Sequence, residues 1–144
     1  MKHNSLIRIL NLLSVKGVGP QRVRFIISHF GVNTDYFTLS SEALCKATGI
    51  DLKTARSVRQ FSEWDYGKKE FDRTNRVGAQ IISFWDEEYP KLLKKIYDPP
   101  VLLYVKGMPL QKEMDCISVV GTRNITPYGK KSHYPSFLIW FLLV

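Results

Sequence analysis

One short loop combines three residue types that together favour anion binding. Gly121, Thr122 and Arg123 follow an apolar run. A helix-start signal, Thr126-Pro127, comes just after them. Glycine lets a ligand approach the main chain, threonine supplies a hydroxyl, and arginine pairs with two phosphate oxygens. The spacing predicts a phosphate site at this loop, and the alternative is a capped turn with a solvated arginine.

Two apolar runs, residues 101–106 and 116–120, would position this loop. Runs of this length without polar alternation are typical of strands buried on both faces of a parallel sheet. A buried strand, a glycine loop and a capped helix form the opening of a doubly wound α/β unit. Only Gly121 and Gly129 stand near the loop, so no G-x-G-x-x-G can be written and no nucleotide cofactor is predicted.

A second candidate site lies near the N-terminus. Apolar residues at helical spacing predict two helices there: Leu6, Ile9, Leu10 and Leu13 in the first, and Val23, Ile26, Ile27 and Phe30 in the second. The connection, Val15-Lys16-Gly17-Val18-Gly19-Pro20, makes this a helix-hairpin-helix pattern. Its glycines would expose main-chain N–H groups to a DNA phosphate. Candidate contacts are Lys16, Gly17, Gly19 and Arg22, with Arg24 nearby. The alternative is a tight turn between packed helices.

A weaker second copy of this pattern follows. Ser40 would cap one short helix, and Asp51 would cap the next in place of the second glycine. The charge of Asp51 would repel phosphate, so this copy is predicted to be structural. Its basic residues are interpreted as a solvated face: Lys53, Arg56 and Arg59.

Aromatic residues punctuate the next stretch: Phe61, Trp64, Tyr66 and Phe71. They are predicted to pack the helical module, with base stacking as the alternative. Gly78 would end the helix, residues 79–84 would form a short strand, and the domain boundary is expected between Arg76 and Tyr89.

Composition narrows the class of protein. A chain of 144 residues, 44% hydrophobic and 24% charged, is globular, with room for one domain or two small ones. The net charge is +8, and residues 1–60 hold nine Lys and Arg against three Asp and Glu. This imbalance predicts an anionic polymer as partner.

The chain has two cysteines and three histidines, and their spacing fits neither a C-x-x-C motif nor a set of metal ligands. These residues are Cys45, Cys116, His3, His29 and His133. Neither a metal site nor a disulfide is predicted, and a reducing cytoplasm is the simplest compartment. Arg8 interrupts the early apolar stretch, so no secretory signal is predicted.

Four motifs follow one another from residue 89 to residue 129. They are Tyr89-Pro90-x-x-Leu93, Tyr97-Asp98-Pro99-Pro100-x-Leu102-x-Tyr104-x-Lys106-Gly107, Ile117-x-Val119-Val120-Gly121-Thr122-Arg123 and Tyr128-Gly129. Their order and spacing resemble the DNA-processing protein A family, also called DprA or Smf. The resemblance implies a Rossmann-like domain that binds single-stranded DNA and hands it to the RecA recombinase in natural transformation. By the same resemblance, Gly121, Thr122 and Arg123 would contact backbone phosphate, and the intact family would form homodimers.

The resemblance stops at about Ser132, and residues 137–144 are all apolar. A membrane anchor would need about 20 such residues, and a buried terminal element would need more sheet to cover it. A truncated or frame-shifted remnant, with impaired activity, is the favoured interpretation.

The expected fold is therefore α+β. Residues 1–78 are predicted to form a helical helix-hairpin-helix (SAM-like) module, residues 79–132 an incomplete Rossmann-like domain, and residues 133–144 a tail outside the family pattern. The expected role is non-catalytic DNA binding. Two alternatives stay open: a nucleotide-binding enzyme that cleaves a base-ribose bond, for which no carboxylate follows Gly129, and an inert fragment.

Overall fold

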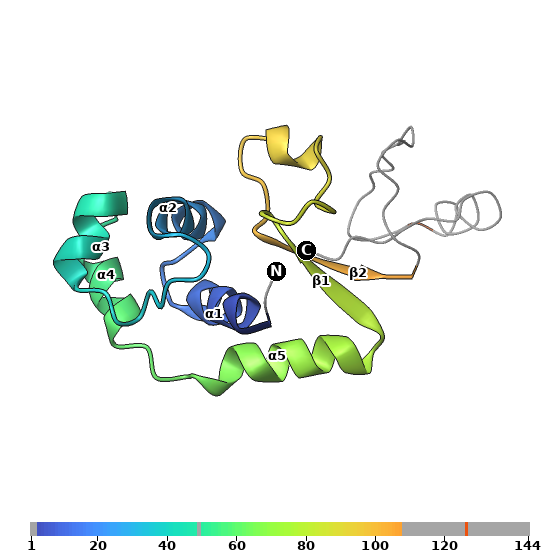
Figure 1. Cartoon of the computed structure of the whole chain (residues 1–144), viewed down its shortest axis with the longest axis horizontal. Coiled ribbons are helices and arrows are strands. Elements are labelled where there is room, and N and C mark those ends of the chain that lie inside the picture. Colours follow the sequence, from blue (N-terminus) through green and yellow to red (C-terminus); the bar gives the residue numbers. More distant parts are fainter. Residues whose placement is uncertain (1–2, 49, 108–125, 127–144) are drawn as a thin grey trace. The chain divides into compact units, whose positions relative to one another are not determined.

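The computed structural model describes residues 3–48, 50–107 and 126 of the chain. The described helices and strands all lie in one compact unit, which spans residues 1–110 (Figure 1). Their order is α1 (His3–Ser14), α2 (Pro20–Phe30), α3 (Ser41–Thr48), α4 (Leu52–Arg59), α5 (Asp65–Arg76), β1 (Ala79–Ser83), a short 3-10 helix η1 (Leu93–Lys95) and β2 (Leu102–Lys106).

The first four helices pack around a common apolar core. The spacing predicted for α1 and α2 is confirmed, since both helices turn their apolar faces inwards. The most deeply buried side chains of this core include Ile9, Leu12, Val23, Ile26, Ile27, Leu44 and Val58. Helix α1 contacts α2, α2 contacts α3, and α3 contacts α4, so the two helical pairs form a tandem.

The predicted caps of α3 and α4 are both confirmed. The N–H of Ala43 donates to Ser40 Oγ at 3.1 Å, and the N–H of Thr54 donates to Asp51 Oδ1 at 2.8 Å. Each cap satisfies one of the N–H groups that a helix leaves unpaired at its start.

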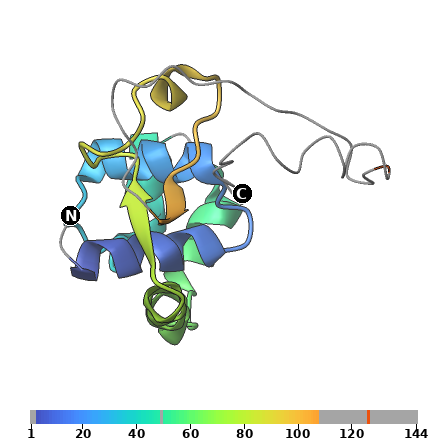
Figure 2. The ribbon, with the colours of Figure 1, turned by 90° about the vertical axis from the view of Figure 1, so that its right-hand side faces the viewer.

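Helix α5 packs along α1, and Figure 2 shows it end-on beside that helix. The approach is close because Gly67 faces α1 without a side chain. The amide oxygen of Asn11 accepts the Gly67 N–H at 2.7 Å, and its amide nitrogen donates to the carbonyl of Trp64 at 3.3 Å. Asn11 thus ties the start of α5 to α1.

The aromatic residues between α4 and α5 pack largely as predicted. Phe61 stacks on Phe37 with ring centroids 4.9 Å apart, and Trp64 meets both rings edge-on. Phe71 of α5 contacts the ring of His3 at 4.3 Å. Tyr66 and Trp64 are nevertheless less buried than predicted, since 43% and 53% of their surfaces stay exposed.

The two described strands pair in antiparallel fashion, with Ile81 opposite Tyr104. Helix α5 ends just before Gly78, whose φ of +69° suits glycine, and β1 follows directly. Residues 84–101 then return the chain to β2. They hold one 3-10 turn and no crossover helix, which a parallel pair would need.

The expectation that β2 is buried on both faces is wrong. Leu103 and Val105 are buried, whereas Leu102 and Tyr104 on the other face are half-buried. An antiparallel pair can leave one face partly open, which a doubly wound sheet cannot. The parallel, Rossmann-like part, which would involve residues 116–120, lies outside the described residues and stays a prediction.

Two core clusters meet at this sheet. Ile82, Tyr89, Leu103 and Val105 form the smaller one, whereas Val101 belongs to the helical core. The boundary predicted near residue 78 stays a prediction. Among the described residues, no helix combines the length and apolar character needed to cross a membrane.

Candidate nucleic-acid interface

The predicted phosphate loop, Gly121, Thr122 and Arg123, lies outside the residues that the structure describes. The predicted helix-hairpin-helix contacts, in contrast, are all described. They lie on the connection from α1 to α2 and on the first turn of α2. The interface is therefore built here from this first hairpin.

Two buried valines hold the first hairpin in place. Val15 and Val18 are 5% and 4% exposed, and the N–H of Val18 donates to the Val15 carbonyl at 3.0 Å. Between them Gly17 has a φ of +85°, a conformation that side-chain-bearing residues avoid. The valines face the core, and both glycines of the hairpin are exposed.

The hairpin opens directly into α2. Gly19 is the N-cap with extended backbone, and Pro20 starts the helix. No side chain caps this end. Helix geometry leaves the N–H groups of Gly19, Gln21 and Arg22 without an intrahelical acceptor, and no hydrogen bond within the described part of the chain uses them. This end of α2 thus offers exposed donors and a positive dipole to an anion.

Arg22 bridges the first hairpin to the second. Its Nη1 donates to the Gly17 carbonyl and, at 3.2 Å, to Thr54 Oγ1, while its Nη2 lies 3.2 Å from Asp51 Oδ2. The Arg22 and Asp51 side chains are 41% and 51% exposed, so water screens this ion pair and it adds little to stability. Its larger effect is to neutralise a cation beside the hairpin.

The carboxylate of Asp51 is held by its own helix. Its hydrogen bonds with the backbone N–H and the hydroxyl of Thr54 lower the pKa of Asp51 below its ordinary value, with a smaller contribution from Arg22. Asp51 therefore stays charged at neutral pH. The start of α4, in turn, already has an anion at its N-cap, which agrees with the prediction that the second copy is structural.

Lys16 is the exposed cation of the first hairpin, and no ion pair or hydrogen bond of the described residues engages its ammonium group. Lys53 and Arg56 are likewise exposed on α4, as predicted for a solvated face, while Arg59 donates to the carbonyl of Phe37 at 3.1 Å. Lys16 is thus the cation best placed to meet a phosphate at the α2 end.

Arg24 does not lie free beside the hairpin. Its Nη1 donates to the Pro99 carbonyl, and its Nη2 lies 2.6 Å from Asp98 Oδ1. Its side chain is only 14% exposed. No local sequence pattern predicts this link, although Asp98-Pro99-Pro100 is one of the motifs that carry the family resemblance.

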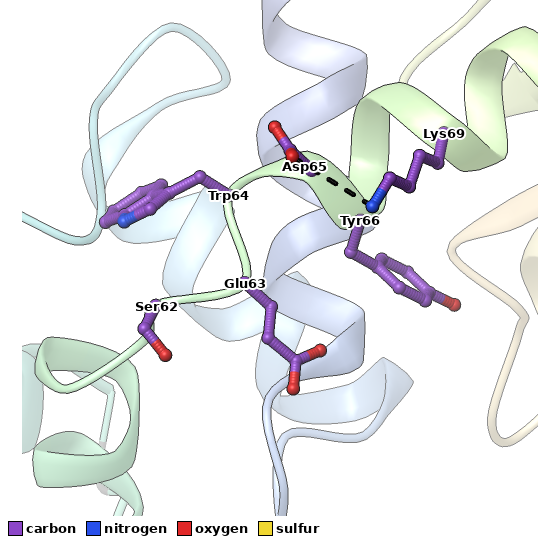
Figure 3. Close-up of a pocket in the computed structure, with 6 residues that line it drawn as sticks. All are labelled: Ser62, Glu63, Trp64, Asp65, Tyr66 and Lys69. Carbon is purple, nitrogen blue, oxygen red and sulfur yellow. Dashed lines mark ion pairs between the residues drawn. The ribbon is translucent and has the colours of Figure 1, made fainter.

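A shallow depression at the start of α5 contains two exposed aromatic residues. Its lining is Ser62, Glu63, Trp64, Asp65, Tyr66 and Lys69. Figure 3 shows the rings of Trp64 and Tyr66 pointing in different directions, and Lys69 pairs with Asp65 at 4.0 Å. The depression therefore lacks the aligned rings and free cations of a base-stacking surface. No group of three potential metal ligands occurs in the described ranges.

Comparison with protein families gives two matches. Residues 80–136 match the family described as DNA recombination-mediator protein A. Residues 9–61 match the SAM-like helix-hairpin-helix tandem. The second match covers α2, α3 and α4 with the second half of α1, and confirms the predicted tandem.

Several curated proteins are similar to this chain. The DNA processing protein DprA of Bacillus subtilis is 47% identical over 97 residues, which is 65% of this chain and 32% of that protein. Protein Smf of Synechocystis is 25% identical over 125 residues, or 81% of this chain and 30% of that protein. DNA ligase 1 of Pseudarthrobacter chlorophenolicus is 27% identical over 93 residues, or 65% of this chain and 12% of the ligase.

The chain thus spans about a third of the length of the DprA and Smf relatives. No solved structure matches it significantly.

Proposed function

We propose that this chain, which belongs to the DprA/Smf family and corresponds to the N-terminal part of its members, binds single-stranded DNA through the phosphate backbone. The observation that carries the proposal is the first hairpin, where exposed N–H groups open α2 beside Lys16. Main-chain N–H groups and a lysine would contact the phosphates and not the edges of the bases, so binding would not depend on the DNA sequence.

The charge of the chain supports this partner. Residues 1–60 combine nine Lys and Arg with three Asp and Glu. An excess of cations raises the local concentration of an anionic polymer and speeds its association. The same positive field would attract single-stranded and double-stranded DNA alike. The proposal of single-stranded DNA as the ligand therefore depends on the family resemblance.

A second phosphate contact belongs to the proposal. Gly121, Thr122 and Arg123 would hold backbone phosphate in the Rossmann-like domain expected over residues 79–132, as the resemblance implies. RecA is the protein partner that the family implies, in recombination during natural transformation and hence in the cytoplasm. Homodimerisation belongs to the intact family and is proposed only for it.

The proposed role is non-catalytic. The likeness to DNA ligases covers 12% of the length of the matched ligase, so that enzyme's reaction is not carried over to this chain. The base-ribose-cleaving alternative would need a catalytic carboxylate near the phosphate loop, and the ionisable residues that follow Gly129, which are Lys130, Lys131 and His133, supply none.

A salt titration of oligonucleotide binding tests the proposal. The logarithm of the affinity for a single-stranded oligonucleotide, followed by fluorescence anisotropy, should fall linearly with the logarithm of salt concentration between about 50 and 200 mM. Replacing Lys16 or Arg123 by alanine should make the slope shallower by about 0.7 each, because each removes one phosphate contact on a single strand.

Lys68→Ala is the matched control, since Lys68 is an exposed lysine on α5, away from the first hairpin. It should leave the slope unchanged. A wild-type chain that does not bind the oligonucleotide at low salt would refute the proposal. Equal slopes for wild type and Lys16→Ala would remove the first hairpin from the site.

A further inference from the structure

We infer that Asp51 limits the DNA affinity of the first hairpin, because it holds the guanidinium of Arg22 that would otherwise pair with phosphate. This inference rests on the proposed function and assigns a regulatory residue to the same site. It concerns a carboxylate on the second hairpin that controls a cation on the first.

Arg22 lies where a phosphate bound by the first hairpin would be. Its own N–H is one of the exposed donors at the start of α2, and its side chain folds back over the hairpin to the Gly17 carbonyl. With 41% of that side chain exposed, the guanidinium is within reach of solvent and of a ligand. A guanidinium can pair with two phosphate oxygens at once.

The two ends of the guanidinium have different tasks. Nη1 donates to Gly17 and Thr54, and so keeps the hairpin shape. Nη2 pairs with Asp51 Oδ2 at 3.2 Å. Loss of the Asp51 charge would therefore free Nη2 while Nη1 keeps its contacts.

The carboxylate of Asp51 also has two tasks. It caps α4 through Thr54, with Oδ1 accepting the N–H at 2.8 Å and Oδ2 the hydroxyl at 2.7 Å. It also opposes the charge of Arg22. Capping requires an oxygen but no charge, and asparagine caps helices about as well as aspartate. The substitution Asp51→Asn thus separates the electrostatic task from the structural one.

The electrostatic balance of the hairpin follows from this pair. Asp51 cancels Arg22, so Lys16 remains as the uncompensated cation of the described hairpin. A phosphate must either compete with a carboxylate that its own helix keeps ionised or bind without the arginine. The wild-type hairpin therefore binds more weakly than its residue composition implies.

The test is a set of four proteins in the salt titration: wild type, Asp51→Asn, Arg22→Ala and the double variant. Asp51→Asn should bind a single-stranded oligonucleotide about two- to fivefold more tightly, the range for a solvent-exposed ion pair. Its salt slope should steepen by about 0.7, because one more phosphate is neutralised. The gain should disappear when Arg22 is alanine.

Asp35→Asn is the matched control. Asp35 lies in the same helical module and also accepts a backbone N–H, from Phe37 at 3.2 Å, but no described ion pair involves it. It should leave the salt slope unchanged. A thermal melt of Asp51→Asn close to that of the wild type confirms that the α4 cap is kept.

The outcomes separate the two claims. Wild-type binding with an unchanged slope in Asp51→Asn contradicts this inference alone, as does a gain that persists without Arg22 or appears equally in Asp35→Asn. Binding by Asp51→Asn but not by the wild type contradicts the proposed function of the wild-type chain, although it agrees with Asp51 opposing phosphate. Absence of binding in both contradicts the inference together with the proposed function.

Discussion

Gly67 shows how one residue sets the distance between two helices. A Cβ built there would lie 2.5 Å from the Ile7 carbonyl oxygen and 2.8 Å from Asn11 Oδ1. The first of these neighbours is backbone and cannot rotate away. Alanine would favour the helix by about 1 kcal/mol, whereas overpacking costs about 1–3 kcal/mol, so the steric effect should win.

We therefore expect Gly67→Ala to lower the free energy of unfolding by up to about 2 kcal/mol, the overpacking cost less the helical gain. Urea denaturation followed by circular dichroism measures this change. Lys68→Ala, one residue along α5 and exposed, should change it by less than about 0.5 kcal/mol. A more stable Gly67→Ala variant would show that α5 can move away from α1 without cost.

At the scale of elements, Arg24 fastens the segment between the two strands onto α2. Its guanidinium joins α2 to Asp98 and Pro99, and nearby the hydroxyl of Tyr89 donates to the Pro100 carbonyl at 2.7 Å. Burial raises the pKa of Tyr89 above its ordinary value, so the hydroxyl remains a donor well above neutral pH. The Asp98-Pro99-Pro100 motif thus has a structural task that connects the helices to the sheet.

Replacing Arg24 by alanine should lower the free energy of unfolding by about 1–3 kcal/mol, because it removes two charge-assisted hydrogen bonds from a mostly buried side chain. Limited proteolysis should also cut residues 84–101 faster, since their anchor on α2 is lost. Arg56→Ala, at an exposed position of α4, is the control and should change neither quantity. An unchanged cleavage rate in Arg24→Ala would show that the segment is held by other contacts.

At the scale of the whole described unit, Val101 joins the sheet to the helical core. It is 2% exposed and belongs to the same cluster as Ile9 and Val23, although it directly precedes β2. Leu103 and Val105, only two and four residues further on, belong to the other cluster. Helices and strands should therefore unfold together.

Val101→Ala should lower the free energy of unfolding by about 2 kcal/mol, for the loss of two buried methyl groups and the cavity they leave. The decrease should appear in the helical signal of circular dichroism, although the substitution is next to a strand. Val77→Ala is the control, because Val77 is 52% exposed and should matter little. A helical signal that melts as in the wild type would indicate that the helices unfold independently of the sheet.

The local elements and the tandem of helices were determined by the sequence alone. Apolar spacing, the glycines of the first hairpin, and the caps at Ser40 and Asp51 each act over a few residues, so a linear pattern contains enough information to place them. The loop at Gly121, Thr122 and Arg123 stays a prediction, since it lies outside the described residues.

Only the tertiary structure decided which side chains meet across long stretches of chain. Arg22 and Arg24 looked alike in the sequence, as two cations beside a hairpin, yet Arg22 meets Asp51 and Arg24 meets Asp98. Likewise, Gly67 is special only because α1 lies against it, and β2 pairs antiparallel to β1 across a connection that has no crossover helix. Such pairings depend on how distant elements pack, and no short-range pattern encodes that.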